Sequence, residues 1–211
     1  MKLSDYKVIR EVGKELSGDI FKYAVESNKQ ELISAAKLLG FWNGKMMAFD
    51  SDSDSETLMD AMVFEKIISN LPACKRFEMS HPKLNDLQLE NMNGLLSNYS
   101  SLFEAKSIDP IGNTLVLEDL LDTKRKEYVL MDVGLSKTSK PGFIHYNRLI
   151  PIRDINMTSG VSFIFEETYK DKLISAISLA AFKKRRKLTS TEMYILMHEK
   201  KKQYGIETRT E

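Results

Sequence analysis

The sequence predicts an α+β protein, in which N-terminal helices precede a five-stranded antiparallel meander or small barrel and C-terminal helices follow it. In the first hundred residues and again after Tyr169, apolar residues recur every three or four positions, which is typical of amphipathic helices. Between Ser101 and Phe165, short runs with a period near two alternate with turn residues, which indicates strands. The chain is therefore expected to contain a helical region (1–100), a barrel-like region (101–168) and C-terminal basic helices (169–211).

Local signals mark the helices of the first region. Four are expected, and the limits of the second are well marked, because Asn28 can cap its start and Gly40 can end it. After it, Asn43-Gly44 lies between apolar residues and predicts a hairpin or a tight turn. The expected helices cover residues 4–25, 28–40, 53–71 and 84–96.

The third of these helices follows an acidic run, residues 50–56. Ser53 and Glu56 have the spacing of a capping box, and Pro72 should end the helix near residue 71. Met62 and Ile67 then fall on its apolar face. The acidic run opens like a calcium loop, but the glycine and glutamate that such a loop needs at its sixth and twelfth positions are missing, so we expect capping.

The strand region should form one antiparallel unit. The expected strands cover residues 102–108, 114–118, 128–133, 143–152 and 161–165. Their connections are too short for crossover helices, which favours antiparallel pairing. Because exposed sheet edges invite wrong pairing, a meander of this length is expected to curl into a small barrel.

The C-terminal region is basic. Residues 169–211 hold 11 Lys and Arg against 5 Asp and Glu, although the whole chain has a net charge of only +1. A helix from Tyr169 should end at five consecutive cations, and a capping box of Thr189 and Glu192 should open a last helix that frays past Tyr204.

Composition and N-terminus fit a globular protein of the cytoplasm. Hydrophobic residues make up 42% and charged residues 29% of the 211, as in ordinary folded chains. The longest mainly apolar stretch, residues 173–182, is far shorter than the ~20 residues of a spanning helix, and no secretory signal is recognised. We therefore expect a cytoplasmic protein without a membrane span. The single cysteine, Cys74, excludes an internal disulfide and is expected to be buried.

Several short segments of this chain resemble a group of mostly uncharacterised bacterial proteins, some described as SEC-C-motif proteins, which join helices to a small β-barrel. The resemblance implies this architecture and no active site, because the Cys/His metal cluster of such proteins has no counterpart here. The similar segments are Leu39-Gly40-Phe41-Trp42-Asn43-Gly44, Leu58-Met59-Asp60, Ser101-Leu102-Phe103-Glu104, Leu115-Val116-Leu117-Glu118-Asp119-Leu120-Leu121, and Pro141-Gly142 with Arg148-Leu149-Ile150-Pro151.

Motifs for catalysis or cofactors are missing from the sequence. It has no nucleophile elbow, no glycine-rich phosphate loop and no His-Glu-x-x-His zinc motif. His81, His145 and His198 lie far apart along the chain. No catalytic residue, cofactor or metal is predicted, and whether the protein is an enzyme stays uncertain, leaning towards no. A hydrolase with a dispersed carboxylate pair remains an alternative.

The leading hypothesis is a non-catalytic binding or interaction module with an unknown protein partner. The main alternative is a protein that binds RNA or DNA through its basic C-terminal helices, since lysine and arginine contact phosphates. The basic run could equally be an exposed helix end without specific function, or it could contact an acidic protein or a membrane surface. Arg148 either stacks with aromatic residues on a barrel face that binds single-stranded nucleic acid or is a plain surface arginine. The oligomeric state is left open. The candidate binding residues are Arg148, Lys183, Lys184, Arg185, Arg186 and Lys187.

Overall fold

A computed structural model describes residues 1–206 of the chain. The fold is α+β, as predicted from the sequence, and it divides into two compact units, Met1–Asn98 and Tyr99–Glu211. The first unit is helical. The second holds a five-stranded sheet followed by two helices.

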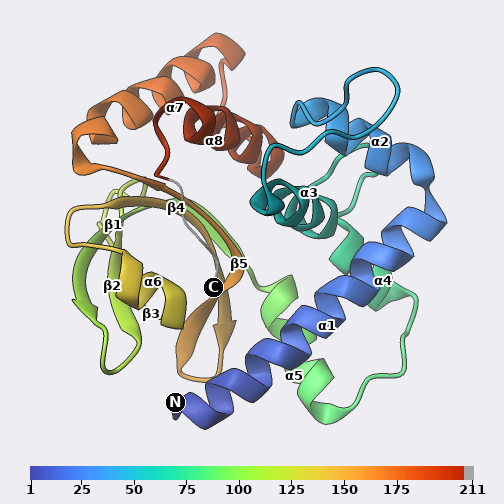
Figure 1. Cartoon of the computed structure of the whole chain (residues 1–211), viewed down its shortest axis with the longest axis horizontal. Coiled ribbons are helices and arrows are strands. Elements are labelled where there is room, and N and C mark those ends of the chain that lie inside the picture. The colour runs from blue at the N-terminus through green and yellow to red at the C-terminus, as the bar shows by residue number, and fades with distance from the viewer. Residues whose placement is uncertain (207–211) are drawn as a thin grey trace. The chain divides into compact units, whose positions relative to one another are not determined.

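The N-terminal unit is organised around its longest helix. Its helices are α1 (Leu3–Ser27), α2 (Lys29–Leu38), α3 (Asp52–Phe64), α4 (Ala73–Met79) and α5 (Asp86–Leu96). One side of α1 buries an apolar stripe, from Tyr6 to Ala24, with the period of three and four residues seen in the sequence. All four other helices of the unit contact α1 (Figure 1).

The boundaries of α2 and the turn after it follow the sequence signals. The Asn28 side chain accepts a hydrogen bond from the Gln30 backbone N–H, and Gly40 ends the helix with a φ of 76°. Asn43 then accepts hydrogen bonds from the backbone N–H groups of two following residues, and Trp42 pairs with Met47. The Asn-Gly segment is therefore a tight turn closed by one antiparallel bridge.

Two expectations for the N-terminal helices were wrong, namely the limits of α3 and the number of helices. The capping box of α3 uses Ser51 and Asp54, and α3 ends at Phe64, so Ile67 lies outside it. Helix α4 was missed altogether; its N-cap residue is Pro72, and no side chain caps its start. Both errors reflect weak local signals: β-branched residues after Phe64 keep the apolar spacing but favour helix poorly, and α4 has only seven residues. Cys74 is buried in α4, as expected.

The C-terminal unit begins with a closed barrel of five strands. They are β1 (Tyr99–Asp109), β2 (Thr114–Asp119), β3 (Glu127–Met131), β4 (Ile144–Ile152) and β5 (Ile155–Phe165). The strands pair in the order β1-β2-β3-β5-β4, and β4 pairs with β1 to close the ring. All five predicted strands are present, but β5 begins at Ile155 and not at residue 161, so most of the connection expected between the last two strands belongs to β5 itself.

The barrel departs from the expected antiparallel meander at one seam. Four pairings are antiparallel, but β3 and β5 run parallel. A closed ring with an odd number of strands cannot alternate direction all the way round, so one parallel pair is unavoidable. The missed helix α6 (Val133–Thr138) carries the chain from β3 to β4, and Asp132 caps it by accepting a hydrogen bond from the Leu135 N–H.

Successive side chains of each strand point alternately into the barrel and out of it, so the barrel has an interior and an exterior surface. The interior residues form one apolar cluster, to which α6 contributes Leu135. His145 lies opposite Phe103 of β1 and Ile164 of β5, and since both are members of this cluster, His145 also faces the interior. The cluster consists of Phe103, Ala105, Leu115, Leu117, Leu130, Leu135, Leu149 and Ile164.

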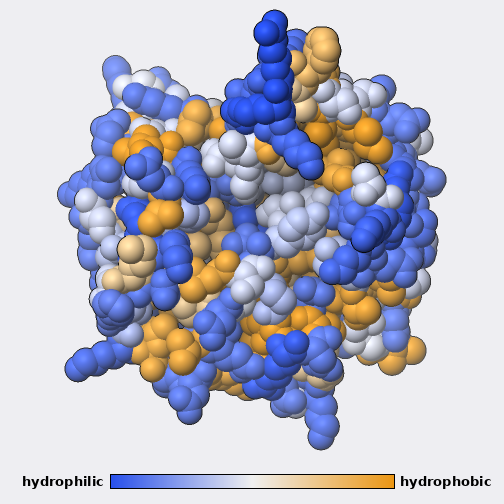
Figure 2. Space-filling model, turned by 180° about the vertical axis from the view of Figure 1, so that it is seen from behind, coloured by the Kyte–Doolittle hydropathy of each residue, from blue (hydrophilic) through white to orange (hydrophobic). Residues whose placement is uncertain are grey.

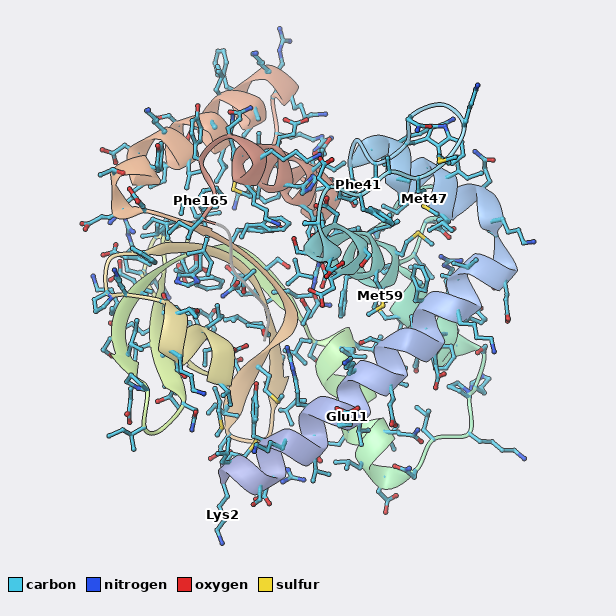
Figure 3. The ribbon with its side chains drawn as sticks, viewed as in Figure 1. Lys2, Glu11, Phe41, Met47, Met59 and Phe165 are labelled. Atoms are coloured by element: carbon cyan, nitrogen blue, oxygen red, sulfur yellow. The ribbon has the colours of Figure 1, made fainter. Side chains whose placement is uncertain are left out.

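Two helices follow the barrel and cover part of its exterior. A short 3-10 turn, η1 (Glu167–Tyr169), leads into α7 (Lys170–Lys184), and α8 (Ser190–Tyr204) follows after a loop. Phe163 and Tyr146 of the exterior contact Tyr194 of α8 through their rings. Figure 3 shows Phe165 between the barrel and these helices, and Phe165 is fully buried. The expected fraying past Tyr204 falls largely on residues 207–211, which lie outside the described part.

Candidate functional site

The basic run lies where α7 ends. Its backbone forms a Schellman motif, in which the Arg186 N–H donates to the Ala181 carbonyl and the Arg185 N–H donates to the Phe182 carbonyl. Arg185 itself has φ 54° and ψ 30°, the left-handed conformation that glycine usually provides at this position. The chain therefore turns sharply within the run.

Glu192 neutralises two of the five cations. Arg186 donates two hydrogen bonds of 2.8 Å to the two carboxylate oxygens of Glu192, and Lys184 lies 2.8 Å from one of them. Hydrogen bonds from Arg186, then Lys184, hold the pKa of Glu192 far below its usual range. The same residue completes the predicted capping box of α8 with Thr189. Glu192 thus links the end of α7 to the start of α8.

The other three cations of the run have no carboxylate beside them within the described residues. Lys183, Arg185 and Lys187 are exposed, and within residues 1–206 their side chains make no ion pair or hydrogen bond. Figure 2 shows a strongly hydrophilic projection at the top of the view, where α7 ends in Figure 1. This turn of chain therefore concentrates uncompensated positive charge at the surface.

Apolar side chains are exposed directly before the cations. Phe182 is 81% exposed and Leu179, one turn earlier, is 55% exposed, whereas Leu173 on the inner side of the same helix is fully buried. An exposed aromatic ring beside cations is a combination that unpaired nucleic-acid bases and phosphates can both use. Sequence reasoning missed these two residues, although a usable signal exists, because Leu179 and Phe182 lie off the stripe formed by Leu173 and Ile177.

A shallow groove of about 410 Å³ runs between α7 and α8 and ends near the other cations of this region. The Tyr169 and Tyr204 rings stack at one end of it, with centroids 4.8 Å apart and planes at 18°. Lys172 lies 5.2 Å from the centroid of the first ring and 5.5 Å from that of the second. The residues lining the groove are Asp171, Lys172, Ser175, Ala176, Leu179, Lys200 and Tyr204.

Arg148 does not join this surface. It is only 4% exposed, and its guanidinium lies 5.9 Å from the centroid of the Tyr194 ring. The expectation of an exposed arginine fails because α8 packs over this side of β4, which the sequence of β4 does not reveal. Arg148 does stack on an aromatic ring, but the contact is internal to the C-terminal unit. We therefore exclude Arg148 from the candidate site.

The side of the barrel formed by β1 and β2 carries balanced charges. Lys106 lies 3.4 Å from Glu104 and 3.8 Å from Glu118, and Glu118 also pairs with Arg125. Burial by itself would raise the pKa of Glu104, but the Lys170 ammonium, which donates a hydrogen bond to it, brings the pKa below its usual value. These pairs leave little net charge to attract a polyanion.

Polar groups inside the barrel serve its structure. Asp119 is fully buried and accepts hydrogen bonds from the hydroxyls of Tyr99, at 2.5 Å, and Ser101, at 2.7 Å. Burial, followed by the hydrogen bond to Asp119, raises the pKa of Tyr99 to about 12. His145 is fully buried, its Nε2 lies 2.7 Å from the Ser139 hydroxyl, and burial lowers its pKa to about 4.

The rival hypothesis of a hydrolase needs convergent carboxylates or a metal. In the described part of the chain, no three His, Cys, Asp or Glu side chains are grouped so that they could hold a metal ion. The buried carboxylates of the barrel are already engaged: Asp119 by the two hydroxyls, and Asp132 by the Thr158 hydroxyl and the Leu135 N–H. The described helices also include none with the length and apolarity needed to cross a bilayer.

Comparisons with known proteins give one match. A family model described as "Family of unknown function (DUF7986)" matches residues 1–211. The searches of curated proteins and of solved structures find no match. The resemblance to SEC-C-motif proteins stays a prediction, since no relative with a name tests it.

Proposed function

Because this chain belongs to the family of unknown function DUF7986, its function must be inferred from its own surface, and we propose that it is a non-catalytic protein that binds nucleic acid through its C-terminal unit. The binding surface is the basic end of α7, with Lys183, Arg185 and Lys187 as the phosphate contacts.

The observation that carries the proposal is the exposed trio of cations without counter-charges. On the barrel, Lys106 and Arg125 lie beside carboxylates. At the end of α7, one carboxylate, Glu192, faces five cations and pairs with only two of them. Concentrated, unpaired cations bind phosphates by releasing the counterions that surround a nucleic acid. An acidic protein partner offers a weaker match, because it would have to present equally dense negative charge.

Binding of a fluorescent 20-nucleotide single-stranded RNA, followed by anisotropy from 50 to 300 mM salt, tests the proposal. The triple variant Lys183→Gln, Arg185→Gln, Lys187→Gln should bind more weakly than the parent, with a log-log salt slope shallower by about 2, or ~0.7 for each phosphate that is no longer bound. The matched control replaces three exposed lysines of α1, Lys7, Lys14 and Lys22, with glutamine. Equal affinities for parent and both variants would refute the proposed surface, as would a parent that does not bind at low salt.

A second variant should strengthen binding. Glu192→Gln keeps a side chain that can complete the capping box of α8, but it releases Lys184 and Arg186 from their carboxylate partner. We expect tighter binding and a salt slope steeper by about 1.4, because two more cations become available for phosphates. The start of α8 should stay folded, which circular dichroism can check. An unchanged slope in Glu192→Gln would show that Lys184 and Arg186 lie outside the binding surface.

A further inference from the structure

We infer that the ligand of this surface is single-stranded nucleic acid, with an unpaired base stacked on Phe182. The inference rests on the proposed function and names the class of nucleic acid that the same surface selects. Two observations support it. The ring of Phe182 is exposed although binding to phosphates alone would not need it, and a groove lies between α7 and α8.

Phe182 is placed to receive a base. Its side chain is 81% exposed and comes immediately before Lys183, so a ring and a cation are presented together. In a duplex, bases are paired and stacked on each other, and their faces cannot reach an aromatic side chain. In a single strand the faces are available, and stacking on an aromatic ring adds affinity with little dependence on base identity. An exposed ring at this position therefore favours a single strand.

The groove gives the strand a path away from Phe182. Leu179, one turn before Phe182, is part of the groove lining, and Ser175 and Ala176 line it with small side chains. Between Lys172 and Phe182, α7 rises by about 15 Å, at ~1.5 Å for each residue. Lys172 and Lys200 provide positive charge at the distant end, although Asp171 beside them reduces it. A short stretch of single strand can therefore contact cations at both ends of the groove.

The far end of the groove also holds a rigid aromatic group. Tyr204 lines the groove and stacks on Tyr169, so its ring is held in one orientation. Lys172 and Lys200 lie within 6 Å of the Tyr204 ring centroid, at 5.5 Å and 5.9 Å. A ring that is fixed in this way needs no reordering when a ligand binds.

An anionic membrane is the competing ligand for an exposed phenylalanine among cations. Membrane-binding helices lay a broad apolar face on the bilayer, whereas α7 exposes two large apolar residues, Leu179 and Phe182. A shallow groove lies between α7 and α8, and a single strand can follow it. We therefore assign the surface to a single strand and use vesicles as an arm of the test.

The test compares a labelled single-stranded 20-mer RNA with a 20-base-pair duplex of the same sequence, at one low salt concentration. The parent should prefer the single strand. Phe182→Ala should lower single-strand affinity by about tenfold, with an unchanged salt slope and unchanged duplex affinity, since the variant loses the ring on which a base would stack. Phe182→Trp should restore single-strand affinity. The matched control is Ile111→Ala, which removes an apolar side chain that is 94% exposed in the β1–β2 loop.

The outcomes separate this inference from the proposed function. If the parent binds single strand and duplex equally and Phe182→Ala binds as the parent does, the inference is wrong while nucleic-acid binding stands. If the parent binds neither RNA, both fail. A parent that binds vesicles of phosphatidylserine and phosphatidylcholine through Phe182, and does not bind RNA, would assign the surface to membranes and overturn the inference. Because Phe182 is so exposed, loss of folding does not complicate these variants.

Discussion

Arg185 occupies a backbone position at which glycine would be less strained. Its φ of 54° at the end of α7 brings the Cβ of an L residue close to its own backbone. Arg185→Gly should therefore raise the free energy of unfolding by about 1 kcal/mol, measured by urea denaturation, while it weakens binding of single-stranded RNA by removing a phosphate contact.

A companion variant separates strain from charge at the same residue. Arg185→Gln removes the charge but keeps a Cβ in the left-handed conformation, so it should weaken RNA binding without the gain in stability. If Arg185→Gly and Arg185→Gln were equally stable, the left-handed conformation would carry no measurable cost. If both bound RNA as well as the parent does, Arg185 would have no part in binding.

His145 makes the stability of the barrel depend on pH. Burial lowers its pKa from 6.5 to about 4, so the unfolded chain binds a proton more readily than the folded one between these values. Its contribution to stability is complete above pH 6.5 and is lost as the pH falls towards 4. We expect the free energy of unfolding to drop by about 2 kcal/mol from this group between pH 8 and pH 5.

The His145→Gln variant provides the control for this pH effect. Glutamine does not titrate, and its amide can still reach towards the Ser139 hydroxyl, which lies 2.7 Å from Nε2 in the parent. Urea midpoints of the variant should change less between pH 8 and pH 5 than those of the parent. Identical pH dependence in the two proteins would show that His145 does not set it.

At the scale of the elements, α3 provides a paired test of the observed helix boundary. Met62 lies within α3 and is 1% exposed, so Met62→Asp would bury a carboxylate and should cost about 3–5 kcal/mol of stability. Ile67 lies after the helix and is partly exposed, so Ile67→Asp should cost about 1 kcal/mol or less, contrary to what the longer predicted helix implies. Equal costs in denaturant unfolding would favour that longer helix.

Elements with strong local signals were predictable from the sequence, and the others depended on distant contacts. The capping residues of α2 and α8 and the turns between the strands have side chains that bind neighbouring backbone groups, so the sequence alone locates them. Helices α4 and α6 have seven and six residues, too few to be stable in isolation. Their buried residues, such as Cys74 and Leu135, hold them in place through tertiary packing.

Only part of the candidate site was predictable from the sequence, as was the case for the helices. The basic run stands out in the sequence, whereas its partial neutralisation by Glu192 depends on the Schellman turn that brings α8 back towards α7. Arg148 looked equally suitable in the sequence, since alternation places it on the exterior of the barrel. Its burial comes from α8, which begins about forty residues later in the chain, and strand periodicity carries no information about such a cover.

At the scale of the whole molecule, the two units divide charge unequally. Residues 1–98 hold 12 Lys and Arg against 15 Asp and Glu, and residues 99–211 hold 19 against 15. A polyanion is therefore attracted to the C-terminal unit, which is why lysines of α1 serve as the control for binding.

The parallel pair of β3 and β5 follows from the number of strands and the closure of the barrel. Strand directions cannot alternate all the way round a closed ring of five strands, so one neighbouring pair must be parallel.

Closure of the barrel between β1 and β4 also sets an order of events on the ribosome. Strands β1 to β3 emerge first, but β1 and β3 each keep an unpaired edge until β4 and β5 are made. At ~5–20 residues per second, translation from Met131 to Phe165 takes a few seconds. An interval of this length separates the emergence of β3 from that of β5, and during it the nascent chain has two unpaired strand edges at which misassembly competes with folding.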